Sequence, residues 1–448
     1  MIVFPHSTIE PAVRIVFINR FFYPDHSATG QMLTDLAFGL AENGATVSVI
    51  ASRLRYDEPD AQLPSREKQR GVAIERISTS RFGRASLALR MIDYLTFYIS
   101  AAWTLAHIAR RGDIVVAMTD PPALSILVSV IARARGAISV NWLQDIFPEV
   151  AEALQVAGRR SSLLFAPFRL LRNLSLRRAS MNLAIGTRMA KRLREFGVDE
   201  ERISVIPNWS DIEAIWPVPS KENRLRAEWG LSNKFVVGYS GNLGRAHGIE
   251  TLLDAIAATS QADEEAKICW LFIGGGACFE QLRRETERQG IANVVFRPYQ
   301  PREKLAESLS VSDVHIVLLK PELEGLIVPS KFYGIAASGR PTVFVGAGDG
   351  EVARLINQFG CGATVASGDG HGLAETLAIF ANDPERCRAM GQRGRAMCEA
   401  NFGKKQAIAA WRKLLESLLD NRQQVAGNLD PDRPVEEVHQ YDETIILR

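Results

Sequence analysis

The chain has 448 residues, 46% of them apolar, and a formal net charge of +2. This length exceeds what one hydrophobic core usually serves, so two domains are expected, and the near-neutral charge excludes a general reason to expect a nucleic-acid partner. The five cysteines form no Cys-x-x-Cys pair, so neither a zinc knuckle nor a disulfide framework is indicated, and a reducing, cytoplasmic compartment is expected.

The first half alternates between short β-branched runs and helical patterns. The runs lie at residues 14–18, 46–52, 113–118 and 137–142. Such alternation predicts parallel strands joined by helical crossovers. The apolar stretch 94–106 has 13 residues, short of the roughly 20 that a membrane-spanning helix needs. We interpret it as a buried helix.

The alternation restarts after a segment rich in Pro, Trp and Asp, which places a boundary near residues 208–220. The predicted fold class is α/β, with two doubly wound parallel-sheet domains facing each other across a cleft. The expected division is given by residue numbers: an N-terminal domain at 1–212, a C-terminal domain at 213–402, a helix packing back on the N-terminal domain at 403–421, and a polar tail at 422–448.

A glycine-rich turn follows one strand of the second half, in "YSGNLGRAHG" at residues 239–248. A strand, such a turn and then a helix present backbone N–H groups and a positive helix end, which suit a phosphate or diphosphate. A tight turn without a ligand is an equally good reading of Gly241 and Gly244 alone. The glycine spacing does not fit a nicotinamide-dinucleotide fingerprint.

A second loop, within residues 318–344, leads into a helix of small residues through Pro329, Ser330 and Lys331. Ser330 is a candidate N-cap. Lys331 in a first helical turn opposes the helix dipole, which a bound anion would explain; a solvated surface lysine is the alternative.

Several motifs in order carry a resemblance to a known family. They include "YSGNLGRAHGIETLLDA", "FIGGG" and "VPSKFYGIAASGRPTVF" in the second half, and "FFYPDHSATGQMLTDLAFGLAENGATVSVIAS" and "WLQDIFPE" in the first. Over roughly residues 14–420 the chain resembles retaining family 4 glycosyltransferases of the GT-B fold, in the branch that builds bacterial exopolysaccharide and O-antigen units of the colanic-acid type. The resemblance implies a nucleoside-diphosphate sugar donor and no metal or other cofactor.

The chain departs from the family pattern at the donor site. Asn242 and His247 occupy the positions where the family commonly has an arginine and a lysine. We expect Arg245 and Lys331 to stabilise the departing diphosphate instead. The usual pair of glutamates is also absent, and Glu324 is the one acid that a shifted loop would bring to the donor.

In the first half, Asp145 follows an apolar strand at the expected cleft. It is our candidate to hydrogen-bond or deprotonate the acceptor hydroxyl, with Glu149 as second choice; an N-cap role for Asp145 is about equally compatible with the following Pro148. Gly30 resembles the family glycine that lets a loop approach the donor phosphates.

Residues 159–194 contain ten Lys or Arg and no Asp or Glu. A basic apolar helix suits an anionic membrane surface, and Arg169, Arg172 and Arg177 are its candidate contacts; a core-packing helix with a solvated basic side is the alternative. The resemblance favours the inner face of the plasma membrane and a polyprenyl-diphosphate-linked saccharide acceptor.

Two other classes of function remain compatible with these features. One is a catalytically silent partner subunit that binds a sugar nucleotide, and the other is a sugar-nucleotide epimerase of the same architecture. The sole strict Asp-x-Asp, at residues 430–432, lies in the expected tail, so no metal site is predicted.

Overall fold

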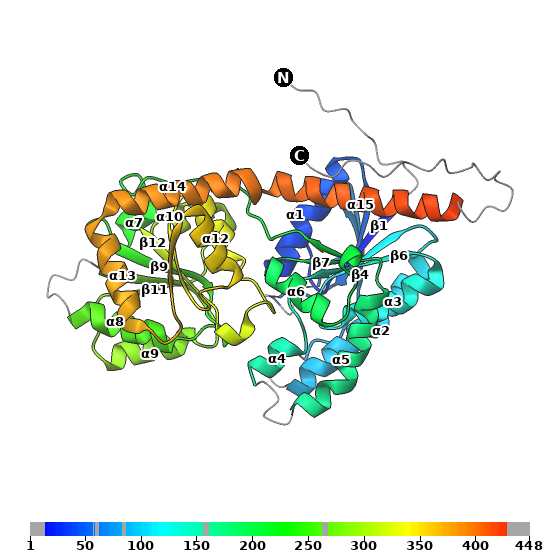
Figure 1. Cartoon of the computed structure of the whole chain (residues 1–448), viewed down its shortest axis with the longest axis horizontal. Coiled ribbons are helices and arrows are strands. Elements are labelled where there is room, and N and C mark those ends of the chain that lie inside the picture. The colour runs from blue at the N-terminus through cyan, green and yellow to red at the C-terminus, as the bar shows by residue number, and fades with distance from the viewer. Residues whose placement is uncertain are drawn as a thin grey trace, which may run out of the picture.

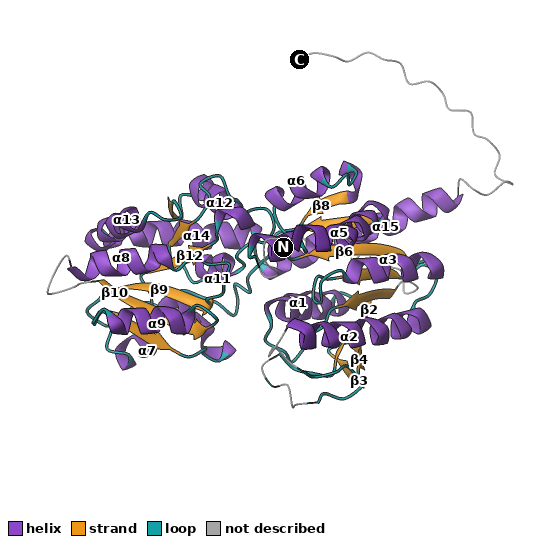
Figure 2. Ribbon diagram, turned by 90° about the horizontal axis from the view of Figure 1, so that it is seen from below, coloured by secondary structure: helices purple, strands orange, loops and turns teal. Residues whose placement is uncertain are grey.

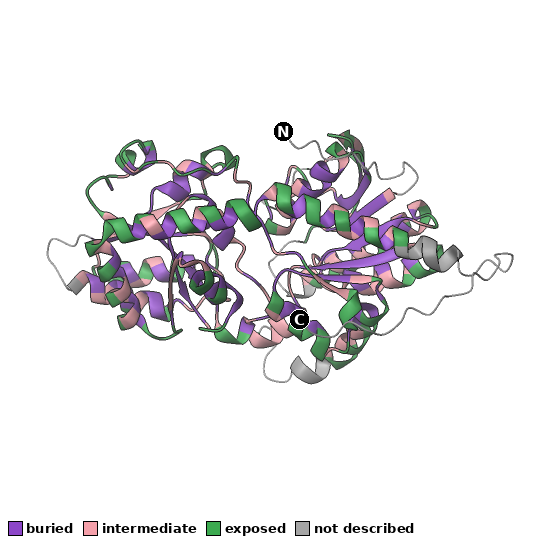
Figure 3. Cartoon of the chain, turned by 45° about the horizontal axis from the view of Figure 1, so that its top comes forward, coloured by how far each residue is buried: buried purple, intermediate pink, exposed green. Residues whose placement is uncertain are grey.

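The computed structural model describes residues 14–427, apart from residues 57, 59–61, 83–86, 156–160 and 262–267. Two α/β domains lie side by side, and the helices α14 (Pro384–Asn401) and α15 (Lys404–Gly427) run along both of them (Figure 1). In each domain the strands form a buried centre covered by helices, as expected for parallel sheets (Figures 2 and 3).

The N-terminal domain contains an eight-stranded sheet in the order β3-β4-β2-β1-β5-β6-β7-β8. Only β3 runs antiparallel to its neighbour among these strands. The strands are β1 (Arg14–Ile18), β2 (Thr46–Ser52), β3 (Arg66–Gln69), β4 (Val72–Ile77), β5 (Ile114–Ala117), β6 (Ile138–Leu143), β7 (Met181–Ala184) and β8 (Ile203–Val205).

Helices cover both faces of this sheet. On one face lie α2 (Leu87–Ile108) and α3 (Leu124–Arg135), which share a core with strand residues such as Val16 and Val115. On the other lie α1 (Ala28–Glu42) and α6 (Thr187–Glu195). The helices α4 (Glu149–Ala153) and α5 (Ser161–Arg178) follow β6, and η1 (Glu200–Arg202) precedes β8.

The C-terminal domain contains a six-stranded parallel sheet in the order β11-β10-β9-β12-β13-β14. Its strands are β9 (Phe235–Asn242), β10 (Ile268–Gly275), β11 (Val294–Arg297), β12 (Val314–Leu318), β13 (Thr342–Val345) and β14 (Gly362–Val365). The helices are α7 (Arg224–Glu228), α8 (Glu250–Gln261), α9 (Phe279–Arg288), α10 (Leu305–Ser310), α11 (Lys331–Ala337), α12 (Glu351–Phe359) and α13 (Gly370–Asn382), with short turns η2 (Arg302–Lys304) and η3 (Pro321–Leu323). Both domains confirm the predicted doubly wound fold.

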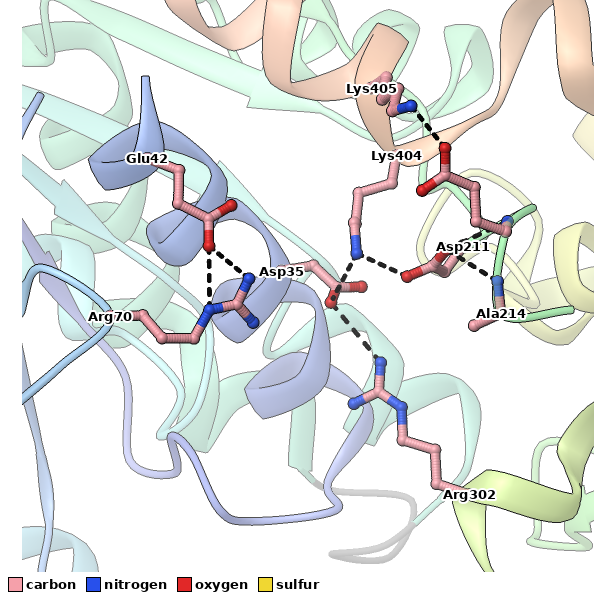
Figure 4. A network of polar contacts seen from close by, with 9 residues as sticks. Asp35, Glu42, Arg70, Asp211, Ala214, Arg302, Lys404 and Lys405 are labelled. Atoms are coloured by element: carbon pink, nitrogen blue, oxygen red, sulfur yellow. Dashed lines mark hydrogen bonds and ion pairs between the residues drawn. The ribbon is translucent and has the colours of Figure 1, made fainter. Parts of the chain in front are cut away.

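The chain crosses between the domains twice, and the two crossings are hydrogen-bonded to each other. Ser210 N–H donates to the carbonyl of Phe402, and Lys404 N–H donates to the carbonyl of Ser210. Beside them, the Lys404 amine lies 2.5 Å from Asp211 and 3.8 Å from Asp35 on α1 (Figure 4). Arg302 of the C-terminal domain also approaches Asp35, at 3.5 Å. These charges tie α1 to the junction.

The helix α15 packs its apolar side against the N-terminal domain. Trp411 is fully buried there, with its ring 4.9 Å from Trp142 of β6 and 6.2 Å from Phe17 of β1. The last helix of the described chain therefore completes the core of the first domain.

The interpretation of residues 94–106 as a buried helix is wrong for one of its faces. These residues belong to α2, which buries Phe97, Ala101 and Leu105 completely but exposes Ile99 and Trp103. A helix apolar on all sides reads as buried from its sequence, yet only one side of α2 meets the sheet. Among the described residues no helix is both long and apolar enough to cross a membrane.

Replacing Trp411 by Ala should destabilise the N-terminal domain by about 3–5 kcal/mol, because a large cavity would open between α15 and the sheet. Hydrogen exchange of the β1 and β6 amides in wild type and variant measures this loss. Trp216→Ala is the matched control, since Trp216 is 52% exposed. Equal exchange rates in W411A and wild type would show that α15 does not stabilise the domain.

Candidate active site

The glycine-rich turn after β9 packs against the turn after β10. Leu243 N–H donates to the carbonyl of Gly275, at 2.7 Å. Gly241 has a φ of +119°, and a Cβ on Gly274 would lie 2.3 Å from the carbonyl oxygen of Gly241. These glycines are therefore needed for the close approach of two backbones. The tight-turn reading explains part of the motif.

Further along the turn, some backbone N–H groups have no acceptor among the residues that the structure describes. Gly244 N–H donates to Nδ1 of His247, at 3.0 Å. The next two amides, of Arg245 and Ala246, donate to no acceptor within the described residues. The Arg245 side chain is exposed and makes no ion pair with the described part of the chain. The turn thus has two amides and one guanidinium available.

The amine of Lys331, at the start of α11, reaches this same turn. It donates a hydrogen bond to the Tyr239 hydroxyl and lies 3.8 Å from the centre of the Tyr239 ring. A Cβ on Gly241 would lie 3.6 Å from Lys331 Nζ. Burial lowers the pKa of Lys331 from 10.5 to about 7. No carboxylate of the described residues forms an ion pair with it.

Tyr239 organises the contact between the two loops. It is 1% exposed, and its hydroxyl donates to the carbonyl of Asn242, at 2.9 Å, while accepting from Lys331. Sequence reasoning did not select Tyr239, although it lies inside the quoted motif. The sequence does contain a signal for it, because an aromatic residue with a hydroxyl group stands just before a glycine turn.

His247 does not supply the positive charge that a lysine commonly provides at this position in the family. Its burial and the nearby Lys331 amine lower its pKa from 6.5 to about 3, so it is neutral at physiological pH. Asn242 is exposed at the end of β9. Lys331 and Arg245 are the two predicted cations that the structure places at this turn.

The acidic loop before α11 is held by the start of α12. Oε1 of Glu324 accepts from the N–H of Glu351, at 2.8 Å. This carboxylate therefore satisfies a free amide at a helix start, which is a structural role. Ser330 stands at the N-cap position of α11, but its side chain makes no capping hydrogen bond.

Glu351 in turn reaches into the N-terminal domain. Its Oε2 accepts from Thr187 Oγ1 and from the N–H of Arg188, at 2.9 and 3.1 Å. Those two residues begin α6, where unpaired amides favour a negative charge. The second loop and the N-terminal domain are thus connected through α12.

Asp145 lies directly opposite the second loop. It forms an isolated bridge with Ile327, and the neighbouring Ile146 N–H donates to the carbonyl of Leu326, at 2.9 Å. Oδ1 of Asp145 is buried without a hydrogen-bond partner among the described residues. It also lines a cavity at the carboxyl ends of β5 and β6, together with Thr119 and Phe147.

The environment of Asp145 favours its neutral form. Burial raises its pKa from 3.8 to about 7, and the negative charge of Asp120 adds to the rise. The N-cap alternative is excluded, because α4 begins at Glu149 with Pro148 at its N-cap position. A desolvated carboxyl with one unpartnered oxygen beside a cavity is suited to hydrogen bonding or proton transfer.

The other candidates of the first domain take part in packing contacts. Glu149 accepts from Arg172, which is 5% exposed, and Glu152 pairs with Arg169. Arg177 donates to the carbonyl of Phe196. Of the three arginines expected at a membrane or acceptor, Arg172 is thus enclosed, and Arg177 is exposed.

Gly30 lies inside the first turn of α1 rather than in a loop. A Cβ there would lie 2.6 Å from Ser27 Oγ and 3.3 Å from the carbonyl oxygen of Phe21. The close fit to its own loop accounts for a glycine at this position.

Comparisons with known proteins agree with this geometry. Residues 27–209 match the family "Glycosyl transferase 4-like domain", and residues 221–397 match "Glycosyl transferases group 1". The probable glycosyltransferase WbjE of Pseudomonas aeruginosa is 29% identical over 60% of this chain and 66% of its own. The putative colanic acid biosynthesis glycosyl transferase WcaI of Escherichia coli is 24% identical over 75% of this chain and 84% of its own.

A solved structure shares the fold. HepE of Anabaena, determined in complex with UDP-glucose, superposes with a TM-score of 0.67 at 17% identity, over 90% of this chain and 99% of that one. The two family matches follow one another along the chain and coincide with the two domains. The chain is therefore a glycosyltransferase of the GT-B fold, in the exopolysaccharide and O-antigen branch of family 4.

Proposed function

We propose that the protein transfers a sugar from a nucleoside diphosphate to an acceptor hydroxyl, with retention of the anomeric configuration. The bond from the anomeric carbon to the diphosphate breaks, and a bond from that carbon to the acceptor oxygen forms. The observation that carries the proposal is the buried Lys331 amine, which has no carboxylate partner in the described chain and lies beside the Gly241 turn. HepE, which has the same fold, was solved with UDP-glucose.

In this proposal the donor diphosphate occupies the space above the turn after β9. The amides of Arg245 and Ala246, the Arg245 guanidinium and the Lys331 amine stabilise the negative charge that develops on the leaving diphosphate. Tyr239 positions Lys331 through its hydroxyl and ring face. No metal ion is required, because these cations and amides supply the positive charge.

The acceptor side is assigned to the cavity at the ends of β5 and β6. There the Asp145 carboxylate accepts a hydrogen bond, and then the proton, from the acceptor hydroxyl. We propose a polyprenyl-diphosphate-linked saccharide as acceptor, at the inner face of the plasma membrane, because the relative WcaI is named for colanic acid biosynthesis.

The donor assignment is tested with sugars linked to UDP, GDP, ADP or dTDP. One of them should raise the melting temperature of the wild type, because a ligand that binds only the folded state stabilises it. With that donor, Lys331→Ala and Arg245→Ala should each reduce turnover by at least about tenfold, from the loss of charge stabilisation of the leaving group. Lys413→Ala, an exposed cation on α15, should keep the wild-type rate.

Three outcomes would contradict the donor assignment. They are the absence of any thermal shift, wild-type turnover in both variants, and donor binding without transfer to an acceptor, which would identify a silent binding subunit. Epimerised donor in a reaction without acceptor would indicate the epimerase chemistry.

The raised pKa of Asp145 predicts how stability depends on pH. Between pH 3.8 and about 7 the folded protein holds a proton on Asp145 that the unfolded chain releases. The free energy of unfolding therefore falls as pH rises through this window. Asp145→Asn removes this titrating carboxyl. The free energy of unfolding of the variant should therefore fall less than that of wild type between pH 3.8 and about 7. Urea unfolding at several pH values measures the free energy of unfolding of wild type and variant. Parallel pH dependences of the two would show that Asp145 ionises normally.

A further inference from the structure

The outer face of α2 carries a continuous row of exposed apolar side chains. Met91, Leu95, Ile99 and Trp103 follow one another at intervals of one helical turn, and all are exposed, with Trp103 at 70%. Single exposed apolar residues are ordinary on a protein surface, but a row of four large ones along one helix is not. The opposite face of α2 is already satisfied by the sheet.

Neighbouring helices extend this surface. α2 contacts α3, and α3 contacts α5, so the three helices lie side by side (Figures 1 and 2). α3 exposes Val130, and α5 exposes three leucines: Leu170, Leu171 and Leu174. We call the apolar side chains named here on α2, α3 and α5 the apolar face.

The exposed charges on the described parts of these three helices have one sign. Asp93 is the only acidic residue within α2, α3 and α5, and it is 1% exposed. The exposed charged residues on α3 and on the described part of α5 are arginines: Arg133, Arg135, Arg177 and Arg178. The face therefore combines apolar side chains with cations and presents no exposed carboxylate.

We propose that this apolar face, led by Ile99 and Trp103 of α2, docks the enzyme onto an anionic lipid surface. Apolar side chains enter the boundary between headgroups and acyl chains, while arginines at the rim contact anionic headgroups. A tryptophan suits this boundary because its ring is apolar and its N–H is polar. The inference deepens the proposed function and rests on it for the lipid-linked acceptor, but it moves the main membrane contact from the basic run of α5 to α2.

Flotation of the full chain with phospholipid vesicles tests the inference. Wild type should float with vesicles of phosphatidylcholine and phosphatidylglycerol, and less with phosphatidylcholine alone. Ile99→Gln combined with Trp103→Gln should lower the vesicle partition coefficient by about tenfold or more, since two large apolar side chains no longer leave water. Ile99→Leu with Trp103→Phe should restore binding.

Two further variants separate apolar insertion from charge and from a general loss of apolar surface. Arg133→Gln with Arg178→Gln should weaken only the dependence on phosphatidylglycerol. Trp216→Gln with Ile379→Gln is the matched control, because both residues are more than half exposed at other places, and it should float as wild type does.

Donor binding provides an independent readout of the same samples. The thermal shift with the nucleotide sugar should be unchanged in the Ile99/Trp103 variant, so a failure of vesicle binding and a failure of the proposed function are distinguishable. Equal flotation of this variant and wild type would overturn the inference. So would a wild-type dimer in the absence of lipid that becomes monomeric in the variant, since the face would then belong to a second copy of the chain.

Discussion

The Lys331 amine is the constraint on which the proposed donor site depends. Removing an ammonium group from water is unfavourable unless an opposite charge compensates it, and here the compensation within the described chain is only the ring and hydroxyl of Tyr239. The lowered pKa of Lys331 is the consequence. A diphosphate beside Gly241 would supply the missing charge and restore the protonated amine. In the proposed function the site therefore has its cation in place before the anion binds, which is the condition for stabilising a leaving group without reorganisation.

The same loop that precedes Lys331 connects the two domains. Glu324 holds the start of α12, and Glu351 of α12 holds the start of α6 in the N-terminal domain. Further along, Asp145 meets Ile327 across the interface. The second loop is thus in direct contact with the N-terminal domain at Asp145, which lines the cavity proposed for the acceptor. Where the chain crosses between the domains, a second set of charges joins them, as Figure 4 shows: Asp35, Lys404 and Asp211.

The doubly wound fold could be predicted from the sequence, because buried parallel strands are continuous apolar runs and glycine turns follow them. The sequence pattern does not predict β3, β4, β7 or β8. The edge strand β3 is polar, β4 contains two charged residues, and β7 and β8 have only four and three residues, so none of them forms a long apolar run. The positioning role of Tyr239 and the helix-start contact of Glu324 arise from tertiary packing between distant segments. Likewise, residues 94–106 of α2 are apolar on every side, and only the position of the sheet decides that Trp103 is exposed.

The titration of the Lys331 amine, followed by NMR through its 13Cε resonance, tests the central claim most directly. Lys331→Arg assigns the resonance. The account predicts a midpoint near the pKa of about 7 in the free protein and a clear rise of that midpoint when the nucleoside diphosphate of the donor that raises the melting temperature is added, because a bound diphosphate favours the charged amine. A midpoint near 10.5, the ordinary value for lysine, or a midpoint that this nucleoside diphosphate leaves unchanged, would contradict it.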